Sequence, residues 1–325
     1  MHFCSDGTRA QSGKNCTTSS HQLRGAIMNL WFAILLPNVT LMYGLHQPKI
    51  GHLGRQILFA TSKKYATFGK YTKTVTVRAS DIAAIINRNQ FKKPSIVFDD
   101  MWLKYSPKTF VGQTRDQVAA AATAKLEPTE RIMIAAAVSY VAKDAADAVS
   151  QFSKAEKKIE ASTTLSTVDK ALVIDELKSQ IFTSHGTRAE SKTADLVEER
   201  EGVVLKTDDT FYNLQLCVID DTMYRISGKV DRLEKVGDEV VLVEIKNRMK
   251  KLFINVPDYE FIQVQIYFQI VPLNIQSAKL IQQFGTTTKT TIIERDDNVW
   301  EKDILPPLLK FCADLHKAMF QTPPP

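Results

Sequence analysis

The sequence predicts a mixed α/β (α+β) fold, because strand-like and helix-like segments both occur along its 325 residues. Residues 212–248 are short β-rich runs separated by turn signals at Asp220-Asp221 and Gly237-Asp238, a pattern typical of hairpins. Residues 115–182 are instead rich in Ala, Lys and Glu, which favours helices. With 44% hydrophobic and 24% charged residues, the composition is that of a globular protein with a real core.

Cysteine spacing and charge exclude several classes of protein. The four cysteines are scattered with no CxxC or CxxxH spacing, which argues against a disulfide framework, a zinc finger or an iron–sulfur cluster and favours a reducing compartment. The net charge of +6 is uneven: residues 1–80 hold ten basic residues and one acid, whereas residues 81–325 hold 32 basic and 35 acidic residues. Only the N-terminal quarter is therefore basic.

Residues 1–45 are expected to be a leader or disordered extension. Residues 26–45 are apolar but contain Asn29, Pro37, Asn38 and Thr40, so a stable membrane span is not expected. About 25 polar residues precede this run, which does not fit a signal peptide. An organellar presequence, or an extension upstream of a natural start at a later methionine, remain open.

Helices are expected at several places along the chain. Ser80 is predicted to be the N-cap of a helix over residues 80–89, with Asp81 in its first turn. Residues 115–182 predict two or three helices with no further role assigned. A last helix is expected from Pro307 to Phe320, with its proline in the first turn. Residues 259–270 are long enough for a helix but ambiguous by hydrophobic period.

The most informative stretch is GKVDRLEKVGDEVVLVEIK. If Gly237-Asp238 form the centre of a type II′ turn, facing residues place Asp231 directly opposite Glu244, with Cβ atoms about 4.5–5.5 Å apart. Lys246 then lies on the same face as Glu244, about 7 Å further along the strand. Two carboxylates and an ammonium group would therefore meet at the end of an apolar, buried strand.

Such a cluster predicts a site for a hard cation. Two close carboxylates repel each other, so one takes up a proton unless a cation neutralises them. Oxygen ligands without nearby Cys or His indicate Mg²⁺ or Mn²⁺. The lysine suits a role in positioning or deprotonating water, or in stabilising charge on a phosphate. The alternative is an ordinary salt-bridged hairpin, because short patterns recur by chance.

The pattern G-x-V-D-x…V-E-I-K-x-R resembles the PD-(D/E)xK nucleases. Three further segments resemble the branch of phage lambda exonuclease and the YqaJ-type viral recombinases. Residues 77–94 are similar to its N-terminal S-D-I-A-x-I-I-G-x-N-P-Y helix, and residues 185–194 to its GxxxExxxA helix. Residues 259–270 are similar to its Gln-x-Gln element. The resemblance covers about residues 72–275, in the family's order.

The resemblance implies roles for residues of the cluster. Asp231 and Glu244 are expected to be metal ligands, with the Ile245 carbonyl as a further ligand. Lys246 is expected to be the catalytic lysine. Glu190 is expected to complete the acidic cluster, directly or through water. It could instead be a solvated glutamate on a helix face, but the small residues Gly186 and Ala194, each four positions away, indicate close packing there.

Three more residues are assigned by the resemblance. Gln263 is expected to orient the lysine or the water, although Gln263 and Tyr267 could form a polar edge of a helix. Ser80 is expected to hold a DNA phosphate at the head of its helix, although capping alone explains it. Lys73 stands where some members bind a terminal 5′-phosphate. The chain departs from the family in having Asn87 where Gly is common, which bears on helix termination.

The resemblance implies a PD-(D/E)xK restriction-endonuclease-like core within residues 46–325: a central mixed sheet flanked by helices, with residues 115–182 as an extra helical segment. It implies a Mg²⁺-dependent (or Mn²⁺-dependent) DNA exonuclease, a hydrolase that digests linear duplex DNA 5′→3′ from 5′-phosphorylated ends in recombination, repair or replication. The rivals are a structure-specific or single-strand endonuclease, a non-catalytic DNA-end-binding protein, and a membrane-anchored protein resting only on residues 26–45.

Partners and location are expectations of the same kind. The resemblance implies DNA as partner, with a single-strand annealing protein and a homo-oligomer by family analogy. The expected location is soluble and intracellular, in the cytoplasm or nucleus of a host if the chain is viral. The basic leader leaves import into an organelle open.

Overall fold

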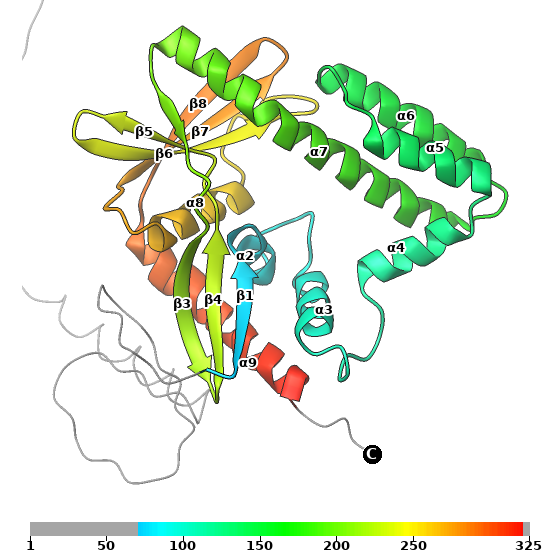
Figure 1. Cartoon of the computed structure of the whole chain (residues 1–325), viewed down its shortest axis with the longest axis horizontal. Coiled ribbons are helices and arrows are strands. Elements are labelled where there is room, and N and C mark those ends of the chain that lie inside the picture. The colour runs from blue at the N-terminus through cyan, green and yellow to red at the C-terminus, as the bar shows by residue number, and fades with distance from the viewer. Residues whose placement is uncertain (1–70, 321–325) are drawn as a thin grey trace, which may run out of the picture. The chain divides into compact units, whose positions relative to one another are not determined.

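The computed structural model describes residues 71–320, all within one compact unit of the chain. The predictions for residues 1–45, including the apolar run at 26–45, lie outside these residues. The α/β (α+β) fold class is confirmed, since two mixed sheets are combined with helices (Figure 1). No helix between residues 71 and 320 has both the length and the apolar character needed to cross a bilayer.

The first sheet has three strands in the order β1-β4-β3. β1 (Lys73–Arg78) runs parallel to β4 (Thr222–Gly228), and β3 (Tyr212–Ile219) runs antiparallel to β4. β3 and β4 are joined by the turn predicted at Asp220-Asp221, where Asp220 has a φ of 49°. Asp tolerates this left-handed conformation better than most residues.

The second sheet has five strands in the order β2-β5-β6-β7-β8. The strands are β2 (Leu205–Thr207), β5 (Arg232–Val236), β6 (Glu239–Asn247), β7 (Ser277–Phe284) and β8 (Thr287–Glu294). β6 and β7 are parallel, whereas the other neighbours are antiparallel. The predicted single central sheet is thus wrong in one respect: the chain leaves the first sheet after β4 and starts a second sheet at β5.

Two helices enclose the second sheet. Ala194 and Val197 of α7 (Thr167–Glu201) belong to one buried cluster with Val243 and Ile245 of β6. α8 (Asp258–Ile270) reaches Lys246, whose side chain points to the opposite face of β6. This helix resolves the ambiguity of the segment over residues 259–270. β6 is therefore buried on both faces, as its apolar run predicts.

The helical segment differs from the prediction in number and extent. Four helices are present instead of two or three: α4 (Arg115–Ala124), α5 (Pro128–Ser139), α6 (Ala145–Ala161) and α7. Pro128 is the first residue of α5, and α7 continues past residue 182 to Glu201, with Gly186 inside it and Gly202 as its left-handed C-cap. Figure 1 shows α7 running from the α4–α6 bundle to the second sheet. The bundle has its own buried core.

The helix predicted at Ser80 begins earlier than expected. α2 (Ala79–Ile85) has Arg78 as N-cap, without a side-chain cap bond, so Ser80 lies inside the first turn and is exposed. The N-cap prediction is wrong because β1 leads directly into α2, where Asp81 is paired with Arg78 at 2.6 Å. Asn87, which stands where the family often has Gly, has a φ of 59° and follows the end of α2.

The remaining helices lie at the start and end of the described residues. α3 (Pro94–Tyr105) follows α2, and the π-helical turn η1 (Val299–Ile304) leads into α9 (Leu305–Phe320). α9 therefore starts two residues before the predicted Pro307.

Gly228, at the end of β4, is a point of close approach. A Cβ atom there would lie 2.8 Å from the Ala79 Cβ, 2.9 Å from the Ile270 Cδ1 and 3.0 Å from the Tyr267 Cε1. We expect Gly228→Ala to lower the free energy of unfolding by about 1–3 kcal/mol through overpacking, measured by urea denaturation. Gly186→Ala is the matched control: nothing lies within 4 Å of its added Cβ.

In α7, Gly186→Ala should raise the free energy of unfolding by up to about 1 kcal/mol, because Ala is the better helix former. Equal stability of Gly228→Ala and the wild type would contradict the close packing of α2 and α8 against β4.

Candidate active site

The β5–β6 hairpin has the predicted register. Arg232 pairs with Val243 and Val236 with Glu239, so the next position places Asp231 opposite Glu244. Gly237 has a φ of 61°, the positive value that the first central residue of a type II′ turn requires. The sequence-based placement of the two carboxylates is therefore confirmed at the level of strand pairing.

The three predicted polar groups lie together at the end of β6. Lys246 Nζ donates to Glu244 Oε1 at 2.6 Å. Asp231 Oδ2 accepts from the Ile245 N–H at 2.8 Å. This bond uses the amide N–H of Ile245. The role of the Ile245 carbonyl as a metal ligand stays a prediction. Glu244 is 3% exposed, so this ion pair lies within the protein.

Glu190 lies on α7, where the charges of Asp231 and Lys246 act on its carboxyl group, and two hydrogen bonds fix that part of the helix. Thr193 Oγ1 donates to Asn247 Oδ1 at 2.7 Å, and Asn247 Nδ2 donates to the Gly186 carbonyl at 3.0 Å. Both bonds join α7 to the last residue of β6. Close packing was predicted at Gly186 and Ala194, each four residues from Glu190: Ala194 is buried, but nothing lies within 4 Å of a Cβ added at Gly186. The sequence reasoning missed Thr193 and Asn247.

Burial raises the pKa of all three carboxyl groups of the cluster. Burial, with the charge of Asp231, raises the pKa of Glu190 to about 7 and that of Glu244 to about 8. Burial also raises the pKa of Asp231, against the attraction of Lys246. Burial alone would lower the pKa of Lys246, but Glu244 and Asp231 outweigh it and raise that pKa. The lysine is therefore protonated in this arrangement.

These pKa values predict a pH-dependent stability. The pKa values of Glu190 and Glu244 in the folded chain, about 7 and about 8, lie above the ordinary glutamate value of 4.5. Their protonation stabilises the fold fully below about pH 4.5, and this contribution is lost as the pH rises through 7 and 8. We expect the melting temperature without divalent metal to fall between about pH 5 and 8 and to level off above that range, measured by calorimetry. Glu190→Gln and Glu244→Gln should each flatten that fall.

The exposed Glu239, in the turn of the same hairpin, provides the control: Glu239→Gln should leave the pH profile unchanged. A flat wild-type profile would contradict the burial of the two carboxylates.

The cluster fits a hard cation by one structural criterion. Glu244 Oε2 is buried and has no hydrogen-bond partner in the described part of the chain, a costly state for a carboxylate oxygen. No group of three or more His, Cys, Asp and Glu side chains between residues 71 and 320 is arranged to hold a metal. Mg²⁺ needs fewer, since it usually binds through one or two carboxylates and keeps several waters. Glu244 and Asp231 meet that need.

Gln263 of α8 contacts the lysine, as predicted. Its Oε1 lies 3.4 Å from Lys246 Nζ, and its Nε2 donates to the Tyr267 hydroxyl at 2.7 Å. Tyr267 is 5% exposed, so Gln263 and Tyr267 are not a solvated helix edge. The buried tyrosine holds the amide so that its oxygen is directed at the ammonium group.

A buried ion pair that the sequence reasoning missed lies beside the lysine. Arg248 donates to both oxygens of Glu260, at 2.5 and 2.7 Å, and to Gln282 Oε1 at 2.9 Å. The arginine is the last residue of the V-E-I-K-x-R pattern, which was the available signal. The negative charge of Glu260 adds to those that raise the pKa of Lys246.

The two residues predicted to contact DNA lie at opposite ends of the β1–α2 segment. Ser80 is exposed in the first turn of α2, and its neighbour Ala79 packs beside Gly228, close to Tyr267. Lys73 is at the other end of β1, where its Nζ donates to the Tyr105 carbonyl at 2.5 Å and lies 5.0 Å from the centre of the Phe320 ring. The structure does not bring Lys73 together with the carboxylates, because its ammonium group contacts the ends of α3 and α9.

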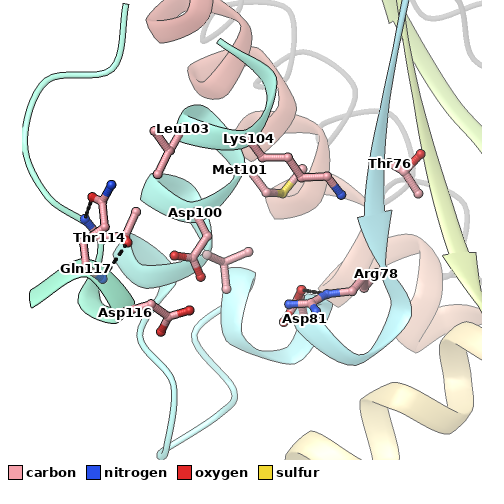
Figure 2. Close-up of a pocket in the computed structure, with 11 residues that line it drawn as sticks. Thr76, Arg78, Asp81, Asp100, Met101, Leu103, Lys104, Thr114, Asp116 and Gln117 are labelled. Atoms are coloured by element: carbon pink, nitrogen blue, oxygen red, sulfur yellow. Dashed lines mark hydrogen bonds and ion pairs between the residues drawn. The ribbon is translucent and has the colours of Figure 1, made fainter. Parts of the chain in front are cut away.

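A separate cavity of about 470 Å³ lies between β1, α2, α3 and the start of α4. Figure 2 shows Asp100 and Asp116 on one side of it and the Arg78–Asp81 pair on the other. Burial and the charges of Asp116 and Asp81 raise the pKa of Asp100 against the attraction of Lys92. Three carboxylates do not suit a phosphate, and the cavity contains neither Glu244 nor Lys246.

Comparisons with known proteins leave the family open. No protein-family model matches the chain, and no curated protein matches it. Among the solved structures similar to it is one described as the crystal structure of SSO0001, with 13% sequence identity and a TM-score of 0.32. The match covers 57% of this chain and 86% of that chain. A likeness at this score carries no argument, so function has to be argued from the site itself.

Proposed function

We propose that the chain is a metal-dependent deoxyribonuclease that hydrolyses DNA phosphodiester bonds. The observation that carries this proposal is the meeting of Asp231, Glu244, Lys246 and Gln263 at the end of a strand buried on both faces, with one Glu244 oxygen unpartnered. An arrangement that needs a cation to be satisfied is costly in a purely structural role.

Each side chain has a role in the proposed hydrolysis. Asp231 and Glu244 would hold Mg²⁺ or Mn²⁺, with the Ile245 carbonyl as a further ligand and Glu190 joining directly or through water. The bound ion would polarise a phosphoryl oxygen and lower the pKa of water. A water oxygen forms the new bond to phosphorus, and the bond from phosphorus to the 3′-oxygen breaks, leaving a 5′-phosphate.

The protonated Lys246 suits two tasks at the reacting phosphate. Its ammonium group can donate to a non-bridging oxygen, where negative charge develops, or to the attacking water. Gln263, held by Tyr267, limits the directions in which the ammonium can point. The proposal of 5′→3′ exonuclease action on linear duplex DNA rests on the family resemblance, since a fold and metal site do not set polarity.

The test is incubation of the purified protein with end-labelled linear duplex DNA and with a covalently closed circle, in Mg²⁺ or in EDTA. Metal-dependent release of mononucleotides from the linear DNA, with the closed circle left intact, supports the exonuclease proposal. Cutting of the closed circle would replace it with an endonuclease on the same site. DNA binding without cleavage in Mg²⁺ would overturn the enzymatic proposal in favour of a binding protein.

A further inference from the structure

The loop between β6 and α8, residues 248–257, lies between the two elements that carry the candidate active site. It begins two residues after Lys246 and leads into the helix that carries Gln263. Lys250 and Lys251 are exposed in this loop, and the Ile254 side chain is 88% exposed. A single exposed aliphatic residue is ordinary on a protein surface, so its setting decides its meaning.

The loop is held in place at Phe253 and at the Ile254 carbonyl. The Phe253 N–H donates to Gln282 Oε1 at 3.0 Å, and the Arg248 guanidinium lies 4.4 Å from the centre of the Phe253 ring. Lys289 Nζ donates to the carbonyls of Phe253, at 3.1 Å, and of Ile254. The backbone is therefore anchored to β7 and β8 while the Ile254 side chain stays in solvent.

The anchoring residues place the loop tip close to the catalytic lysine. Lys246 pairs with Gln282, and Gln282 pairs with Lys289, so these three residues form one row across three adjacent strands. Neighbouring strands are about 4.8 Å apart, which puts Lys289 about 10 Å from Lys246 in the sheet. A DNA strand whose phosphate lies at Lys246 therefore passes the loop within a few nucleotides.

The chemistry of the loop matches that strand. Two exposed ammonium groups suit consecutive phosphates, and a held aliphatic side chain can contact the face of a base where the base step is opened. We propose that residues 250–254 bind the DNA beside the scissile bond. Lys250 and Lys251 pair with phosphates, and Ile254 packs against an unstacked base. This inference rests on the proposed nuclease function and adds the contact that opens the substrate.

The test compares single variants in a Lys246→Met background, which keeps the DNA whole. The probes are linear duplexes with 2-aminopurine at each of the first positions from one end, because this base becomes brighter when it unstacks. Ile254→Ala should reduce the fluorescence rise at saturating protein at least twofold. Lys250→Ala and Lys251→Ala should keep that rise but weaken binding and reduce the salt slope by about one each.

Two exposed residues away from the site are the matched controls. Val204 is 77% exposed before β2, and Lys235 is exposed on the hairpin, two residues before Gly237. Val204→Ala and Lys235→Ala should match the parent in both readouts. A full fluorescence rise and unchanged affinity in Ile254→Ala would overturn the inference while leaving the nuclease proposal intact. Absence of DNA binding by the parent, with no cleavage by the wild type, would overturn both.

Discussion

Replacement of Lys246 by methionine is expected to reduce the rate of DNA cleavage by about 10²–10⁴-fold, the range seen when a group that handles protons or developing charge is removed. The ammonium contacts both Glu244 and Gln263, so the change removes the charge at the centre of the cluster. Methionine has a similar volume, and Glu244 can take up a proton near pH 8. The variant should therefore stay folded, which circular dichroism would check.

A second buried lysine in the same sheet provides the control. Lys279 of β7 lies 2.6 Å from Glu234 of β5, which is 4% exposed. The strand pairing places these two residues on the face of β6 opposite to Glu244 and Lys246. Lys279→Met should lower stability, because it leaves a buried carboxylate unpaired, yet keep the cleavage rate of the folded protein. Equal loss of cleavage in both variants would contradict the catalytic role proposed for Lys246.

Glu244→Gln is expected to abolish the response of the protein to Mg²⁺. A ligand that binds only the folded state stabilises it by about 2.7 kcal/mol at a concentration one hundred times its dissociation constant. Wild-type protein at pH 8 should therefore melt several degrees higher in saturating Mg²⁺, measured by calorimetry. The glutamine variant should show no such rise and should lose DNA cleavage by at least about 10²-fold.

Glu234→Gln is the matched control for this experiment, since it removes a buried carboxylate on the face of the sheet opposite to Glu244. It should keep the full Mg²⁺-induced rise in melting temperature. If Mg²⁺ stabilises the Glu244→Gln protein as much as the wild type, then the ion binds elsewhere and the cluster is a structural ion pair.

The β5–β6 hairpin was determined by the sequence alone. Gly237-Asp238 close a two-residue turn, and such a turn sets the register of both strands at once. Asp231 therefore had to face Glu244, and Lys246 had to share its face, because side chains alternate along a strand. Asn87 is a similar local case, since its left-handed conformation at the end of α2 depends on the residue itself.

Only the tertiary structure decided which distant residues complete the site. Glu190 depends on the Thr193–Asn247 bond between α7 and β6, and Gln263 depends on the buried Tyr267 hydroxyl. Lys73 was placed by the same kind of reasoning but lies at the far end of β1. Contacts between elements depend on how helices pack on a sheet, and residue spacing along one chain does not contain that geometry. The sequence thus determined the local pair of carboxylates and its lysine, and packing decided what surrounds them.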